Sequence, residues 1–137
     1  SELVTILGTM IQLEWTGSIL GIEQQAEDWS KELGWRTRRS EKHLRETLLG
    51  DYVVTQLLIF AEPNLYVLDP VARFIPGGQG TIDLALQPSY NTTSLYRDDE
   101  GKWYVHLEIR AGVSHGERVE WNKDSFRKAI EQLKDLP

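Results

Sequence analysis

The chain has 137 residues, of which 40% are hydrophobic and 26% are charged, and its formal net charge at pH 7 is -6. These values are typical of one soluble globular domain spanning residues 1–137, and they argue against a disordered chain and against a broad basic surface for nucleic acid. The absence of cysteine excludes disulfide frameworks, thiol nucleophiles and cysteine-rich zinc sites.

The N-terminal segment, residues 1–17, carries Glu2 and Glu14 around a short apolar stretch and has no basic leader, so it lacks the layout of a secretory signal. It fits a helix, but Gly8 weakens that prediction and residues 10–16 fit a strand equally well. No run approaches the roughly twenty apolar residues that cross a bilayer. We therefore expect a soluble protein without membrane contact, and we assign it to the cytoplasm on general frequency alone, since a chain without cysteine suits any compartment.

The pattern over residues 18–33 predicts a helix with one buried side, because apolar residues recur at spacings of four, three and four. These residues are Ile22, Ala26, Trp29 and Leu33. Gly34 then indicates the end of the helix.

A second, short helix is predicted over residues 41–49. Ser40 is suited to its N-cap, Leu44 and Leu48 lie one turn apart, and Gly50 follows the last helical residue.

From residue 52 the periodicity becomes that of strands, separated by turn sequences at residues 62–64, 75–80 and 98–102. The predicted strands are residues 52–62, 65–69, 81–87, 94–97 and 103–110. The apolar pattern of residues 52–62 also fits a buried helix.

The last segment, residues 122–136, predicts a helix with Asn122 as its N-cap and with Trp121 packed on Phe126 as a hydrophobic staple. The predicted fold is therefore α+β: a mostly antiparallel sheet of about 4–5 strands, with N-terminal helices and one C-terminal helix packed on one face.

Two strands carry carboxylates within an apolar pattern. Alternation places Asp83 on the face opposite Ile82 and Leu84, and it places Glu108 and Arg110 on one face of the later strand. Two carboxylates a few ångströms apart hold Mg²⁺ or Mn²⁺. The alternative is the solvated face of a half-covered antiparallel sheet, where this alternation needs no function.

These positions locally resemble the restriction-endonuclease-like nucleases, in which an Asp on one strand and a Glu-x-Lys on another bind the metal. The resemblance implies a divalent-metal phosphodiesterase with Asp83 and Glu108 as ligands and Arg110 in the place of the lysine. Arginine cannot deprotonate as lysine does, so the likeness departs at a key position. The leading interpretation therefore names no catalytic residue, no metal and no cofactor.

A second candidate is the basic segment, residues 35–45, which is dense in cations for an acidic chain. It contains Arg36, Arg38, Arg39, Lys42 and Arg45. Such a cluster suits an anion or an acidic partner, whereas a solvated loop between helices is the alternative. We expect a non-enzymatic accessory or regulatory domain that works through a protein partner or through self-association as a homodimer, with nucleic acid an unlikely partner.

Overall fold

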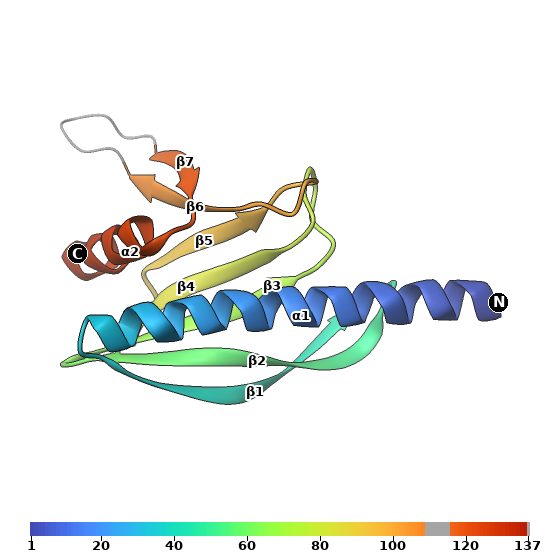
Figure 1. Cartoon of the computed structure of the whole chain (residues 1–137), viewed down its shortest axis with the longest axis horizontal. Helices are drawn as coiled ribbons and strands as arrows, with labels where there is room; N and C mark the ends of the chain where they lie inside the picture. The colour runs from blue at the N-terminus through green and yellow to red at the C-terminus, as the bar shows by residue number, and fades with distance from the viewer. Residues whose placement is uncertain (109–115, 137) are drawn as a thin grey trace.

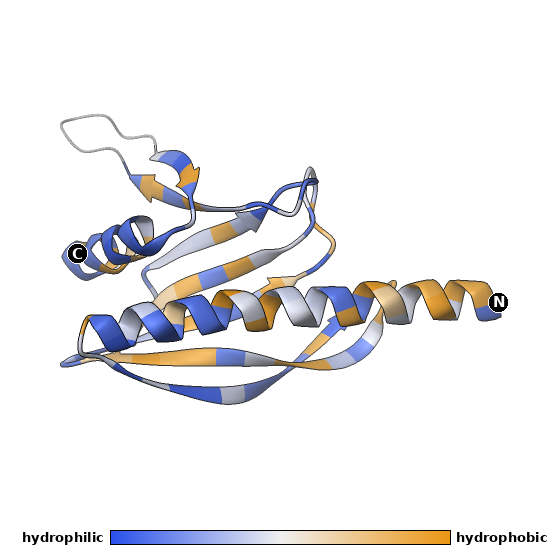
Figure 2. Cartoon of the chain, viewed as in Figure 1, coloured by the Kyte–Doolittle hydropathy of each residue, from blue (hydrophilic) through white to orange (hydrophobic). Residues whose placement is uncertain are grey.

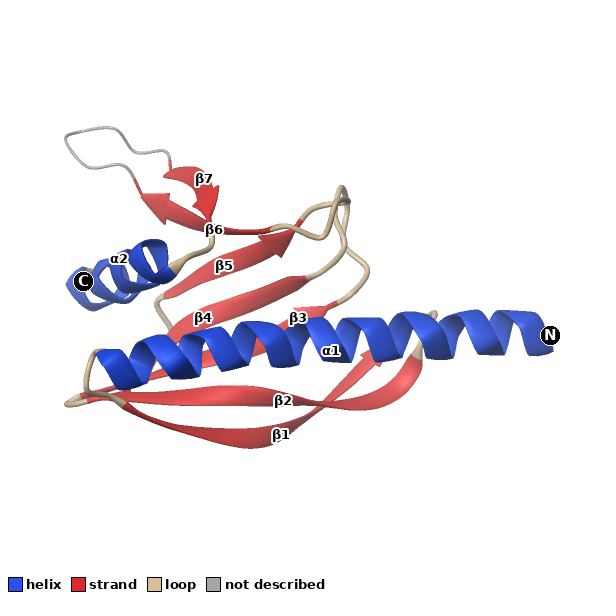
Figure 3. Ribbon diagram, viewed as in Figure 1, coloured by secondary structure: helices blue, strands red, loops and turns tan. Residues whose placement is uncertain are grey.

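The computed structural model describes residues 1–108 and 116–136, which form two helices and a seven-stranded antiparallel sheet (Figure 1 and Figure 3). The elements are α1 (Glu2–Glu32), β1 (Arg36–Glu46), β2 (Gly50–Ala61), β3 (Asn64–Ala72), β4 (Thr81–Gln87), β5 (Thr92–Arg97), β6 (Trp103–Glu108), β7 (Gly116–Glu120) and α2 (Lys123–Asp135). Each strand pairs with the next in the order β1-β2-β3-β4-β5-β6-β7. The predicted α+β class is confirmed, but the described residues form seven strands rather than four or five.

The N-terminal helix α1 is one continuous element of 31 residues. It covers most of both N-terminal segments, residues 1–17 and 18–33, which were predicted separately, and residues 10–16 are helical rather than extended. The predicted end is confirmed, since Leu33 is the C-cap and Gly34 has a φ of +82°, which favours glycine.

The predicted helix over residues 41–49 is wrong. Residues 36–46 form β1, which pairs in register with β2 from Arg36↔Phe60 to Glu46↔Gly50. This long ladder satisfies the backbone of both strands, so tertiary pairing overrides the weak local preference for a helix. Gly50, with a φ of +72°, ends a hairpin turn rather than a helix.

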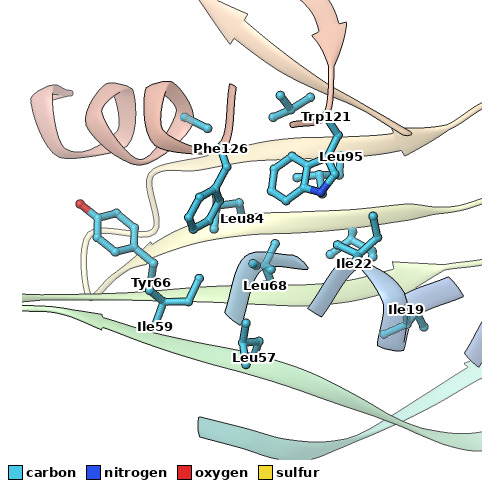
Figure 4. Packing of buried hydrophobic residues seen from close by; sticks show 14 of the residues in the cluster. Ile19, Ile22, Leu57, Ile59, Tyr66, Leu68, Leu84, Leu95, Trp121 and Phe126 are labelled. Atoms are coloured by element: carbon cyan, nitrogen blue, oxygen red, sulfur yellow. The ribbon is translucent and has the colours of Figure 1, made fainter. Parts of the chain in front are cut away.

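Both helices lie against the same face of the sheet, as predicted, and they enclose the core with it (Figure 1). Figure 4 shows side chains of α1, α2 and the central strands meeting there. The largest fully buried residues include Trp15, Ile19, Leu57, Ile59, Tyr66, Leu68, Ile82, Leu84, Leu95, Phe126 and Leu133. The predicted staple is present, because the rings of Trp121 and Phe126 are 5.6 Å apart and Asn122 caps α2.

A buried arginine attaches the middle of α1 to β5. The Arg97 guanidinium is almost fully buried and donates hydrogen bonds to Glu14 at 2.8 and 3.0 Å and to the Gln79 carbonyl at 2.9 and 3.1 Å. It also lies over the rings of Trp15 and Trp103, 5.2 and 5.9 Å from their centroids. These hydrogen bonds hold the pKa of Glu14 below its ordinary value. We call these five residues the arginine clasp.

The packing of the Trp15 ring also depends on a glycine. Gly80, in the loop between β3 and β4, has a φ of +143°, and a Cβ built there would lie 2.3 Å from the Trp15 ring. The backbone therefore approaches the indole more closely than any other residue type allows.

A second polar group is buried under α1. Glu23 is 1% exposed, and the Thr55 hydroxyl donates a hydrogen bond to its Oε1, while its Oε2 has no hydrogen-bond partner. Burial raises the pKa of this carboxyl above its ordinary value, against the lowering effect of the Thr55 hydrogen bond.

Candidate functional site

The two predicted carboxylates lie on the sheet face that the helices leave open, as alternation requires. Asp83 is on β4 and Glu108 is at the end of β6, with β5 between them. Two strand spacings amount to about 10 Å, whereas two oxygens that share one Mg²⁺ lie within about 4 Å of each other. The structure therefore does not bring Asp83 and Glu108 together, and Arg110 lies outside the described residues.

Asp83 has a closer acidic neighbour that the sequence analysis did not single out. It pairs in register with Asp69 on β3, whose Oδ1 lies 2.5 Å from Lys42 Nζ, and it accepts a hydrogen bond of 2.9 Å from Ser94. Burial raises the pKa of Asp83, and the charge of Asp69 adds to the rise, whereas the Ser94 hydrogen bond and Lys42 lower it. Within residues 1–108 and 116–136, no group of three or more metal-ligating side chains gathers here or elsewhere.

The five cations of the basic segment lie on β1, which is an edge strand rather than a loop between helices. Arg39 points toward α1, where it donates to Glu27 at 3.0 Å, whereas Lys42 contacts Asp69 across the open face. Arg36 and Arg45 pair with Glu62 at 3.3 Å and with Asp51 at 3.7 Å. Arg38 is exposed on the same strand. The structure thus divides these cations between two faces and gathers them into no single patch.

A depression with a volume of about 630 Å³ lies between the ends of β5 to β7 and the C-terminal end of α2. Its polar lining is already engaged internally, because Arg118 lies 4.0 Å from the centroid of the Tyr96 ring and His106 lies 3.6 Å from Glu108. We find no convergent set of free polar groups in its described lining.

The most unusual surface is the N-terminal part of α1. Six large apolar side chains there have exposed fractions between 49% and 67%, and a seventh, in the turn between β1 and β2, is 71% exposed. They are Leu3, Val4, Ile6, Leu7, Met10 and Leu13 of α1 and Leu48 of the turn. We call this surface the apolar tip. Figure 2 shows the concentration of hydrophobic residues at this end of the helix.

The apolar tip carries no charge between Glu2 and Glu14. The hydroxyls of Thr5 and Thr9 donate to the carbonyls four residues earlier, at 3.2 and 3.0 Å, so their donors are satisfied within the helix. A Cβ built at Gly8 would lie 3.7 Å from the Leu48 carbonyl oxygen, which places the hairpin turn beside this part of α1.

By length and composition, α1 is also the one helix in the described part of the chain that is able to cross a membrane, with a mean hydropathy of 1.3 over its best 18 residues. Core helices and signal sequences share this length and composition, but 11% of these 18 residues are buried, whereas a core helix is mostly buried. The expected lack of membrane contact therefore stays a prediction, since this helix has the length and hydropathy of a span although it holds no run of about twenty apolar residues. Glu14 lies within this unbroken helix and is paired with Arg97.

The apolar tip was not predicted, because the sequence pattern leaves the conformation of residues 2–15 open between helix and strand. The available signal was the run of eleven uncharged residues from Leu3 to Leu13, which is mostly apolar over three turns. A helix that is apolar on most sides needs cover from other atoms, so this run predicts a covered helix whichever partner provides the cover. Comparisons with protein-family models, with curated proteins and with solved structures find no match to this chain.

Proposed function

We propose that this domain is a non-catalytic accessory module that works by association, and that the apolar tip is the surface through which it associates. The single observation that supports this proposal is the exposure of seven large apolar side chains at one end of a well-packed domain. Monomeric proteins rarely expose contiguous apolar patches beyond a few hundred Å², and larger ones mark interaction sites.

The size of the surface is sufficient for such a role. Fully burying a Leu-sized side chain gains about 1.5–3 kcal/mol, so seven side chains that are roughly 60% exposed offer about 6–13 kcal/mol on complete burial. Association costs about 4–15 kcal/mol in lost freedom, so covering most of the tip is needed for stable binding. The carboxylates and the cations of the basic segment are mostly paired within the chain, so they leave less free surface for a partner than the apolar tip does.

The test compares the wild type with the double variant Ile6→Gln/Met10→Gln, which removes apolar surface but keeps good helix formers. Leu20→Gln is the matched control, because Leu20 is also exposed on α1 but lies outside the tip. Sedimentation velocity measures self-association, and flotation and micelle binding measure association with lipid and with dodecyl maltoside. We expect the wild type and the control to associate in at least one assay and the double variant to lose that association. A wild type that stays monomeric and free of lipid and micelles overturns the proposal.

A further inference from the structure

We infer that the apolar tip inserts into the hydrocarbon of one leaflet of an electrically neutral lipid bilayer. This inference rests on the proposed function and names the partner of the same surface. Four observations lead to lipid rather than to a second copy of the chain: the width of the apolar arc, the projection of the helix, the internal hydrogen bonds of its hydroxyls and the distribution of charge.

The apolar arc is wider than a helix-pairing seam. A second copy packed along α1 would cover residues at spacings of three, four and three, namely Leu3, Ile6, Met10 and Leu13. At about 100° per residue, Val4 lies well off this seam, and the apolar positions from Leu13 round to Val4 span about half of the circumference. A helix partner would leave part of this arc in water, whereas lipid covers it all.

The first turns of α1 extend beyond the end of the sheet (Figure 1), and every residue from 1 to 7 is exposed. From Leu3 to Leu13 no side chain carries a charge, and both threonine hydroxyls donate to backbone carbonyls, so hydrocarbon would leave neither donor unpaired. Leu48 lies beside Gly8 and adds a second apolar contact at the base of the projecting turns.

Glu2 decides how the tip enters the leaflet. End-on entry of the segment from Leu3 to Leu13, which rises about 16 Å, would place the Glu2 carboxylate near the bilayer centre, where a charged side chain is strongly disfavoured. The helix therefore lies along the interface, with its apolar half in the acyl chains of one leaflet and Glu2 at the headgroups. Beyond Leu13, the arginine clasp attaches the helix to the sheet, so deeper entry would require the domain itself to leave water.

The charge of the domain favours a neutral surface over an anionic one. The chain has a formal net charge of -6, and the ion pair closest to the hairpin turn, Arg45 with Asp51, contains both signs. An anionic membrane attracts clusters of Lys and Arg, and such a cluster is lacking around the described residues of the tip. Binding through the tip is therefore expected on phosphatidylcholine alone and with little dependence on salt.

The experiment uses the absence of cysteine in the chain. Single variants Ile6→Cys and Leu20→Cys are labelled with an environment-sensitive dye and mixed with phosphatidylcholine vesicles, with or without lipids that carry a quencher in the acyl chain. We expect a blue shift and acyl-chain quenching at position 6 and neither at position 20. In flotation of the unlabelled protein, Ile6→Asp should weaken vesicle binding roughly a hundred-fold, as expected for an acid moved into hydrocarbon.

The outcomes separate the two proposals. If the wild type self-associates through Ile6 and Met10 but does not float with phosphatidylcholine vesicles, the lipid inference is overturned and the proposed function stands. Binding that requires anionic lipid and disappears at high salt also overturns the inference. If the wild type neither floats nor associates in any form, both proposals fail.

Discussion

The arginine clasp predicts a measurable coupling between α1 and β5. Arg97 is about 5% exposed, whereas the Glu14 carboxylate is 59% exposed and is able to regain water when its partner is removed. Arg97→Met keeps most of the packing but removes the donors to the Gln79 carbonyl, and we expect it to cost about 2 kcal/mol of stability. Glu14→Gln replaces the carboxylate that faces the Arg97 guanidinium with a neutral amide, and we expect a cost of about 1 kcal/mol.

The double variant Arg97→Met/Glu14→Gln measures the pair itself. Breaking a fully buried ion pair costs about 3–5 kcal/mol, but the exposure of Glu14 reduces the expected coupling to about 1 kcal/mol. Urea unfolding of the four proteins gives the coupling energy, provided that the slope of unfolding free energy against urea is unchanged. Additive costs, within about 0.3 kcal/mol, would refute the view that this pair attaches the helix to the sheet.

Three further variants test the packing of α1. Gly80→Ala should destabilise the fold by about 3 kcal/mol in the same urea assay, because its Cβ would meet the Trp15 ring and its φ is left-handed; an unchanged midpoint contradicts this contact. Gly17→Ala should instead stabilise by about 0.5–1 kcal/mol, since the space around a Cβ there is open and the position is mid-helix; a loss of stability would show that this space is occupied in solution. Glu23→Gln should gain stability over the wild type as pH rises. The folded-state pKa of Glu23 is raised, so its stabilising contribution is complete below the unfolded value near 4.5 and is lost as pH rises through the folded value. Thermal unfolding from pH 4 to pH 8 checks this sign, and a constant difference between the two proteins contradicts it.

The sequence predicted the parts of the fold that short-range patterns determine. Gly34 ended a helix as expected, Asn122 capped another, and the alternation around Asp83 placed it on the open face. The segment over residues 41–49 was misassigned because a leucine spacing of four fits a helix locally, whereas residues 41–46 are extended by pairing with residues 50–55, which no local pattern encodes.

The candidate site was less accessible to sequence reasoning. Whether Asp83 and Glu108 meet depends on strand order, and β5 intervenes between their strands. The apolar tip depends on where the sheet stops covering α1, which is a property of the packed domain rather than of residues 3–13. Once the helix is known to be continuous, the uncharged run is a strong indication of a covered surface.

The continuity of α1 has a mechanical consequence. The same 31-residue helix carries the exposed N-terminal turns and the buried turns around Trp15 and Ile19, without a break in its backbone between them. A force or a fixed direction imposed at Leu3 is therefore transmitted as a lever arm to the sheet, because no hinge separates the two halves. Whatever holds the first turns would also set the orientation of the whole domain and decide which way its open face, with Asp69 and Asp83, is presented.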